Sequence, residues 1–120
     1  MSALPAHSDP PLERVGAFRA RIHSRPDAVW VHAAGELDIA SVGMLDRLLS
    51  EAQAGTRLVV LDLEELTFMA GCGARAVADA AARGRAAGRR FMVLPPPAHL
   101  RAVFELTGLA PEIGSPPRRG

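Results

Sequence analysis

The chain has 120 residues, the usual size of one domain. Its formal net charge at pH 7 is +1, which argues against strong electrostatic binding to nucleic acid or to an anionic membrane. No apolar run approaches the roughly 20 residues that span a bilayer, and the first residues lack a signal-peptide apolar region. The single cysteine excludes an internal disulfide, so we expect a cytoplasmic protein.

Both ends of the chain contain several prolines and show no regular apolar spacing. We expect flexible tails over residues 1–14 and 113–120, which leave one domain over residues 15–112. Arg118 and Arg119 are expected to be solvated ends of the second tail, because two arginines there are a weak signal for nucleic-acid binding.

Between the tails, strand-like and helix-like patterns alternate. In chain order we expect strands over 17–23 and 28–34, a helix over 41–54, a strand over 57–63, a helix over 73–87, a strand over 91–94 and a helix over 98–107. The helix over 41–54 has apolar residues at helical spacing. The strand over 57–63 is a nearly continuous apolar run, which is typical of a strand buried on both faces.

This order of elements predicts the fold class. After the opening strand pair, strands alternate with helices, which is typical of an α/β fold with crossover connections. We therefore expect a mixed β-sheet of four to five strands with helices packed against it.

The sequence shows no pattern that indicates catalysis. The four histidines are scattered and have no partner at metal-ligand spacing. There is no Gly-x-Ser-x-Gly elbow, phosphate loop or dinucleotide fingerprint. We therefore expect no enzyme activity, no metal and no cofactor.

Four short segments stand in a distinctive order. They are Gly35-Glu36-Leu37-Asp38, Leu61-Asp62-Leu63 followed by Leu66-Thr67-Phe68, the segment Phe68 to Gly73, and Leu106-Thr107-Gly108-Leu109. Together they resemble the STAS domain, which occurs in bacterial anti-sigma factor antagonists and at the cytoplasmic ends of sulphate transporters. The resemblance covers residues 15–112 and implies a STAS-like sheet and a non-enzymatic regulatory role.

The resemblance also locates a missing switch. The family's loop before the second helix typically reads Asp-Ser-Ser-Gly, and a partner kinase, which is also the anti-sigma factor, phosphorylates the first serine. In this chain Ala70 replaces the aspartate, Gly71 replaces the phosphoacceptor serine, Cys72 replaces the second serine, and Gly73 is kept. Glycine has no hydroxyl group, so position 71 cannot accept a phosphoryl group.

The resemblance implies a partner of the anti-sigma factor and serine-kinase type, bound without a phosphorylation switch at the usual site. The expected contact residues are Glu36, Asp38, Ser41, Met69, Ala70, Gly71, Cys72 and Gly73. Two alternatives stay open: an accessory STAS subunit of a membrane lipid transporter, and a small-ligand or anion sensor at the glycine-rich helix start. No membrane insertion and no nucleic-acid partner are expected.

Several of these side chains also have simpler structural interpretations. Asp38 is expected to cap the following helix, and Phe68 is expected to anchor its loop in the core. Ser41 and Thr67 could replace the lost acceptor, but a cap and a turn residue are the favoured interpretations.

Two further residues near these loops have alternative roles. Asp62 is expected to end its strand and to bind loop amides. Cys72 is expected to be a small, partly buried substitute for serine. A redox-active thiol at the helix start is the alternative for Cys72.

Overall fold

Five strands form one mixed sheet in the computed structural model, which describes residues 12–105 of the chain. In sheet order they are β1 (Leu12–Val15), β2 (Phe18–Ser24), β3 (Val29–Leu37), β4 (Leu58–Met69) and β5 (Arg90–Leu94). The helical elements are α1 (Val42–Gly55), α2 (Gly71–Ala86), the 3₁₀ turn η1 (Ala98–Leu100) and the short helix α3 (Arg101–Glu105). The first three strands are antiparallel neighbours, whereas β3, β4 and β5 run parallel.

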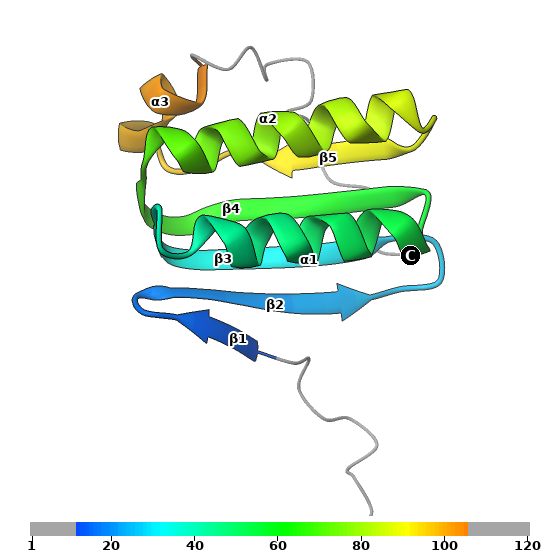
Figure 1. The fold of residues 1–120 in the computed structure, drawn as a ribbon, viewed down its shortest axis with the longest axis horizontal. Coiled ribbons are helices and arrows are strands. Elements are labelled where there is room, and N and C mark those ends of the chain that lie inside the picture. Colours follow the sequence, from blue (N-terminus) through cyan, green and yellow to red (C-terminus); the bar gives the residue numbers. More distant parts are fainter. Residues whose placement is uncertain (1–11, 106–120) are drawn as a thin grey trace, which may run out of the picture.

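The connections place both long helices on one face of the sheet (Figure 1). α1 joins β3 to β4 and α2 joins β4 to β5, as expected when parallel neighbours need a crossover. The helices therefore begin at the end of the sheet where β3 and β4 finish, and they end where β4 and β5 begin. This arrangement gives the molecule two opposite ends that differ in their chemistry.

The main core lies between the sheet and the two helices. Its members come from β2, β3, β4, β5, α1, α2 and the η1–α3 region, and they include Phe18, Val31, Leu61, Leu49 and Val77. α2 presents mostly alanines to this core, so it approaches α1 and the sheet closely. Gln53 of α1 fixes the contact, since its buried side-chain amide donates to the carbonyl of Ala80 at 2.7 Å.

The opposite face of the sheet carries a smaller apolar cluster. It is formed by Ala28, Trp30, Leu58, Val60 and Leu94. Strand β4 contributes to both clusters, so the prediction that its apolar run is buried on both faces is confirmed.

The predicted fold class is also confirmed, because the sheet is mixed, has five strands and is covered by helices. The strand expected over 28–34 continues to Leu37, so Gly35, Glu36 and Leu37 lie in β3. Two further boundaries were wrong. Residues 12–14, expected in the flexible tail, belong to β1, which pairs with β2 through a turn at Gly16 with φ +57°. A hydrogen-bonded ion pair between Glu13 and Arg47 joins β1 to α1, and this bond raises the pKa of the Arg47 guanidinium.

The other of these two boundaries is the end of β4. The strand was expected to stop at Leu63 but continues to Met69. The apolar run that defined the strand stops before Glu64 and Glu65, but both of these side chains are exposed in a strand whose pairing with β3 is irregular there. Four predicted features lie outside the described residues. They are the fourth family-like segment (106–109), the end of the last predicted helix, the predicted domain end at 112 and the distal parts of both tails.

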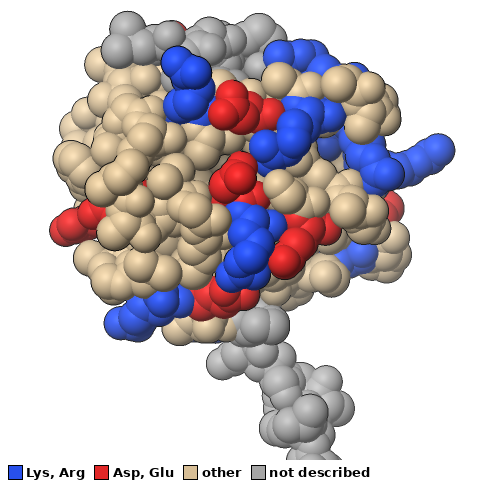
Figure 2. Space-filling model, viewed as in Figure 1, with Lys and Arg blue, Asp and Glu red and all other residues tan. Residues whose placement is uncertain are grey.

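The surface over the two helices is unevenly charged (Figure 2). Arginine side chains gather towards the end where α1 and α2 finish. None of the helices in residues 12–105 is long and apolar enough to cross a membrane.

Candidate partner-binding site

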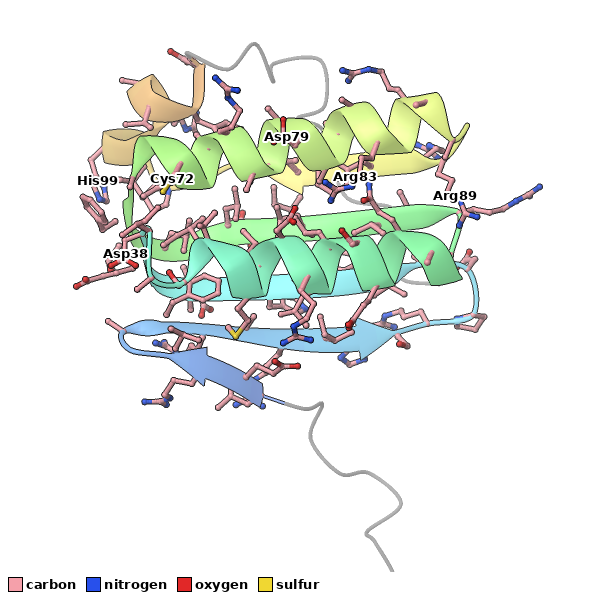
Figure 3. All side chains as sticks on the ribbon, in the orientation of Figure 1. Asp38, Cys72, Asp79, Arg83, Arg89 and His99 are labelled. Carbon is pink, nitrogen blue, oxygen red and sulfur yellow. The ribbon has the colours of Figure 1, made fainter. Side chains whose placement is uncertain are left out.

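Two loops meet at the end of the sheet where α1 and α2 begin. Leu37 of β3 pairs with Met69 of β4, and the amide of Ala70 donates to the carbonyl of Leu37 at 2.9 Å. The loop after β3 and the start of α2 are therefore neighbours, and Figure 3 shows Asp38 and Cys72 at the same end of the molecule. The prediction that these segments share one end of the domain agrees with this geometry.

The end of β3, which leads into the first loop, depends on Gly35. Its φ is +88°, and a Cβ at this position would lie 1.9 Å from the carbonyl oxygen of Ala17. The neighbouring amide of Glu36 donates to that same oxygen at 3.0 Å. Only glycine allows this close approach, and the irregular pairing that follows leaves Glu36 exposed while Leu37 is buried.

Asp38 organises the turn that leads into α1. Its carboxylate accepts a hydrogen bond from the amide of Ala40 at 3.0 Å, and its carbonyl accepts from the amide of Val42 at 2.9 Å. The carboxylate thus stabilises a turn before α1 and does not cap the helix itself, in contrast to the expectation. It remains partly exposed and accessible to a partner.

Ser41 occupies the N-cap position of α1, but its hydroxyl makes no capping bond. The hydroxyl oxygen accepts from the amide of Asp38 at 3.0 Å and lies 3.2 Å from the Asp38 carboxylate. Only 1% of the residue is exposed. Ser41 therefore holds the turn together from inside, and the expectation that it contacts a partner or replaces the lost phosphoacceptor does not agree with its burial.

The second loop is very short, because β4 ends at Met69 and α2 begins at Gly71. Ala70 occupies the N-cap position without a side-chain cap, and no acidic residue stands in the first turn of α2. Gly71 is exposed, and a Cβ built there would meet nothing within 4 Å. Cys72 is partly exposed. The helix start therefore faces outward with open space over residue 71.

Two predicted contact residues of this loop are buried. Only 2% of Met69 is exposed, and its side chain belongs to the main core. Gly73 is also buried, and a Cβ there would lie 2.7 Å from the Leu37 side chain. Both residues support the loop from within, so neither the Met69 side chain nor the Gly73 backbone is available to a partner.

Phe68 was expected to anchor the loop in the core, and this prediction was wrong. The pairing of β4 with β3 shifts register between Leu66 and Phe68, so strict alternation is broken and both Leu66 and Met69 lie in the main core. Phe68, between them, is 47% exposed. Ile39, in the loop after β3, is 78% exposed. These two apolar side chains were missed as site residues, although an exposed apolar residue is a common mark of a binding surface.

Three other residues differ from or add to the predicted site. Thr67 was expected in a turn but lies exposed in β4. Its carbonyl is 3.2 Å from Nε2 of His99, which comes from η1 and reaches the same end (Figure 3). Asp62 was expected to end its strand. It instead lies within β4, where it accepts from the amide of Glu64 at 2.9 Å and lies 3.1 Å from the ring of His32.

The site has no chemistry of a metal centre. Residues 12–105 contain no group of three or more His, Cys, Asp or Glu side chains that could hold a metal ion. What the two loops offer is an outward-facing surface of polar and apolar groups around an uncapped helix start.

A family model described as "Mlab, STAS domain" matches residues 20–113, a range that includes both loops and both long helices. The chain belongs to the STAS domain family. The glycines at positions 35 and 73, which the two loops require sterically, lie inside this match. No curated protein sequence matches the chain.

Solved structures share the fold of this STAS domain. The anti-sigma factor antagonist SpoIIAA in its unphosphorylated form is 24% identical, with 82% of this chain and 89% of that chain covered and a TM-score of 0.70. The phosphorylated form of the Bacillus cell fate determinant SpoIIAA is also 24% identical, with 82% and 92% covered and a TM-score of 0.67. An anti-sigma factor antagonist from Mycobacterium paratuberculosis is 21% identical, with 85% and 87% covered and a TM-score of 0.65.

Proposed function

We propose that this STAS domain is a non-enzymatic regulatory module that binds an anti-sigma factor of the serine-kinase type through the two loops. The observation that carries the proposal is the pair of exposed apolar side chains, Ile39 and Phe68, at the same end as the open start of α2. We name the docking face the loop face. It consists of Glu36, Asp38, Ile39, Phe68, Ala70, Gly71 and Cys72.

The composition of the loop face suits a protein partner. A protein interface usually has an apolar centre and a polar rim. Ile39 and Phe68 supply apolar area, and burial of such side chains contributes about 1.5–3 kcal/mol each. Glu36 and Asp38 supply negative charge beside them, which favours a partner with basic residues at the matching positions.

The proposal includes the absence of a phosphorylation switch. SpoIIAA is known in phosphorylated and unphosphorylated forms, whereas Gly71 has no hydroxyl to modify. A phosphate at a helix start would add about −1.5 to −2 charges, and a docked partner would have to desolvate that group. Without it, the partner binds irrespective of kinase activity.

Co-purification from the native host tests this proposal. The full chain serves as bait, with and without ATP and Mg²⁺, and mass spectrometry identifies what is retained. We expect a sigma-regulatory kinase-type protein in equal amounts under both conditions and no phosphate on the bait. Recovery of a transporter ATPase would favour the accessory-subunit alternative. Release of the partner by ATP would contradict the absence of a switch.

A further inference from the structure

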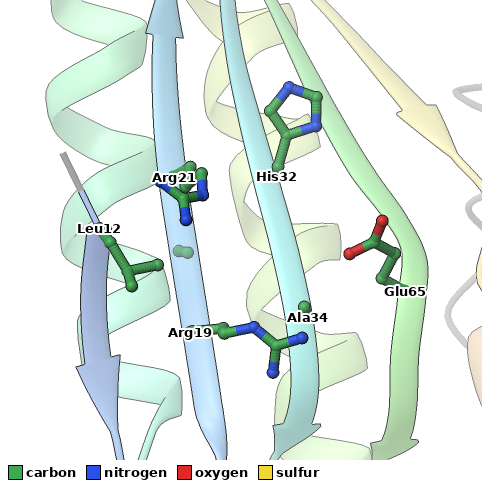
Figure 4. A pocket seen from close by; sticks show the side chains of 7 residues that line it. Leu12, Arg19, Arg21, His32, Ala34 and Glu65 are labelled. Atoms are coloured by element: carbon green, nitrogen blue, oxygen red, sulfur yellow. The ribbon is translucent and has the colours of Figure 1, made fainter. Parts of the chain in front are cut away.

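A row of side chains crosses the face of the sheet opposite α1 and α2. Arg14 of β1, Arg19 of β2, Ala34 of β3 and Glu65 of β4 are successive cross-strand neighbours in this row. We call these four residues the rear patch. Arg19 points away from the helices, because the adjacent Phe18 lies in the main core and side chains alternate along a strand. Figure 4 shows this face with the helices behind the sheet.

The centre of the rear patch is hollow. Ala34 is 6% exposed, and its small side chain leaves a cavity of about 60 Å³ that Arg19 and Glu65 help to line. These two charged side chains lean towards Ala34 from opposite sides (Figure 4). A cation and a carboxylate therefore flank a small residue at which another molecule can approach the sheet closely.

The charges of the rear patch are not compensated within residues 12–105. None of its three charged side chains has an ion-pair partner there. Arg14 and Arg19 are direct cross-strand neighbours, and like charges in that relationship destabilise a sheet. Positive charge thus gathers over β1 and β2, while Glu65 places negative charge over β4.

The neighbouring row of the sheet has the same order of charges. Arg21 of β2 and Asp62 of β4 lie on either side of His32 of β3. Asp62 is 3.1 Å from the His32 ring, and Arg21 also has a partner of its own. The proposal that follows therefore rests on Arg19 and Glu65.

We propose that a second copy of this chain docks on the rear patch, so that Arg19 of each copy pairs with Glu65 of the other. Two sheets that pack face to face lie about 10 Å apart with their strands nearly aligned. A two-fold axis between the sheets, parallel to the strands and over β3, places β2 of each copy over β4 of the other. Residues of one row keep their position along the strands, so the ion pair forms twice.

The distribution of charge selects this axis and this partner. A two-fold axis across the strands would place β2 over β2 and bring the arginines of two copies together. A nucleic acid or an anionic lipid surface would bring phosphates against Glu65. With the axis along the strands, opposite charges meet on both sides, and Ala34 faces Ala34 of the second copy at the centre.

The expected contact is small. Four strands about 4.8 Å apart, over the seven residues of β2 at about 3.3 Å each, outline about 450 Å² on each copy. The total of about 900 Å² is at the low end of specific interfaces, and ion pairs contribute specificity more than affinity. We therefore expect a weak, reversible dimer with a dissociation constant of about 10–100 µM.

The test is sedimentation velocity of the purified full chain from about 5 to 500 µM, a range that brackets the expected dissociation constant. The variants R19E and E65R each bring like charges together in their own dimers, so each should dimerise at least about tenfold more weakly than the wild type. R75E is the control, because it changes an exposed arginine of α2 by the same charge. It should dimerise like the wild type.

An equimolar mixture of R19E and E65R gives the sharpest result. In the mixed dimer every contact of positions 19 and 65 joins opposite charges, so we expect dimerisation to return to the wild-type level. An ion pair between Arg19 and Glu65 of the same chain would give no such recovery on mixing. The doubly substituted R19E/E65R protein should dimerise with itself for the same reason as the mixture.

Three outcomes would overturn the proposal: a wild type that stays monomeric over the whole range, single variants that dimerise like the wild type, and a mixture that stays monomeric. Thermal unfolding checks that each variant is folded. If one single variant does not fold, a folded R19E/E65R protein that stays monomeric overturns the proposal in its place. Only the purified chain is present, so the result does not depend on the partner of the loop face.

Discussion

Gly73 at the start of α2 lies directly over Leu37 at the end of β3, and a Cβ on the glycine would be 2.7 Å from the leucine side chain. The contact fixes how closely α2 approaches the sheet at the loop face. Gly71, two residues earlier, has open space around it. Two glycines in one helical turn therefore have different roles: Gly73 is required by packing, and Gly71 marks the position of the lost acceptor.

The first prediction concerns this pair of glycines. Gly73→Ala should lower the free energy of unfolding by about 1–3 kcal/mol, because the buried Leu37 side chain has to move. Gly71→Ala adds the same methyl group to open space and should leave stability unchanged or raise it by up to about 1 kcal/mol. Urea unfolding measures both. Equal effects of the two substitutions would contradict the packing role of Gly73.

The second prediction concerns Gly35. Gly35→Ala combines a φ of +88° with a Cβ 1.9 Å from the Ala17 carbonyl, so we expect a loss of about 3 kcal/mol. Gly43, exposed in the first turn of α1 with nothing within 4 Å, is the control. Gly43→Ala should stabilise the domain by about 0.5–1 kcal/mol. A Gly35→Ala variant as stable as the wild type would show that the loop does not need glycine.

The third prediction restores the switch. Because nothing lies within 4 Å of a Cβ at Gly71, a serine fits there without rearrangement. Ala70→Asp with Gly71→Ser should therefore accept phosphate from the kinase-type partner in the presence of ATP, and the partner should then dissociate. Phosphate incorporation by intact-mass spectrometry checks this. Ala70→Asp alone is the control and should stay unmodified.

A doubly substituted protein that binds the kinase but takes up no phosphate would indicate that the acceptor is not presented to the active site. A doubly substituted protein that is phosphorylated and remains bound would contradict the electrostatic explanation of the switch. The two results are distinguished by measuring complex formation and bound phosphate in the same sample.

The sequence predicted the fold well because the continuous apolar run of β4 and the helical spacing of apolar residues in α1 are strong local signals. Its errors have physical causes. Glu64 and Glu65 are exposed strand residues that interrupt the apolar run, and the exposure of Phe68 follows a register shift between β3 and β4 that no local pattern reveals. β1 is short and partly exposed, and it is held by pairing with β2 and by the Glu13–Arg47 pair, neither of which is visible as a local pattern.

The candidate site was predictable in its location but not in its exposed side chains. The motif positions predicted a site around Asp38, Gly71 and Cys72; the structure places the two loops that carry them side by side, and their contact with a partner stays a prediction. The burial of Ser41 and Met69 depends on tertiary packing, and the exposure of Ile39 depends on the turn that Asp38 forms.

The central claim is that the loop face binds the partner, and Ile39 and Phe68 test it most directly. Ile39→Ser and Phe68→Ser remove exposed apolar area and should leave stability within about 0.5 kcal/mol. Leu12→Ser, at the third exposed large apolar residue, is the matched control on β1. The measurement is the amount of kinase-type partner that each bait retains from the native host.

We expect the wild type and the Leu12→Ser protein to retain the partner equally. The Ile39→Ser/Phe68→Ser protein should retain at most about one tenth as much, because truncation of an apolar hot-spot residue commonly lowers the binding free energy by more than about 1 kcal/mol. Equal retention by all three baits would contradict the account.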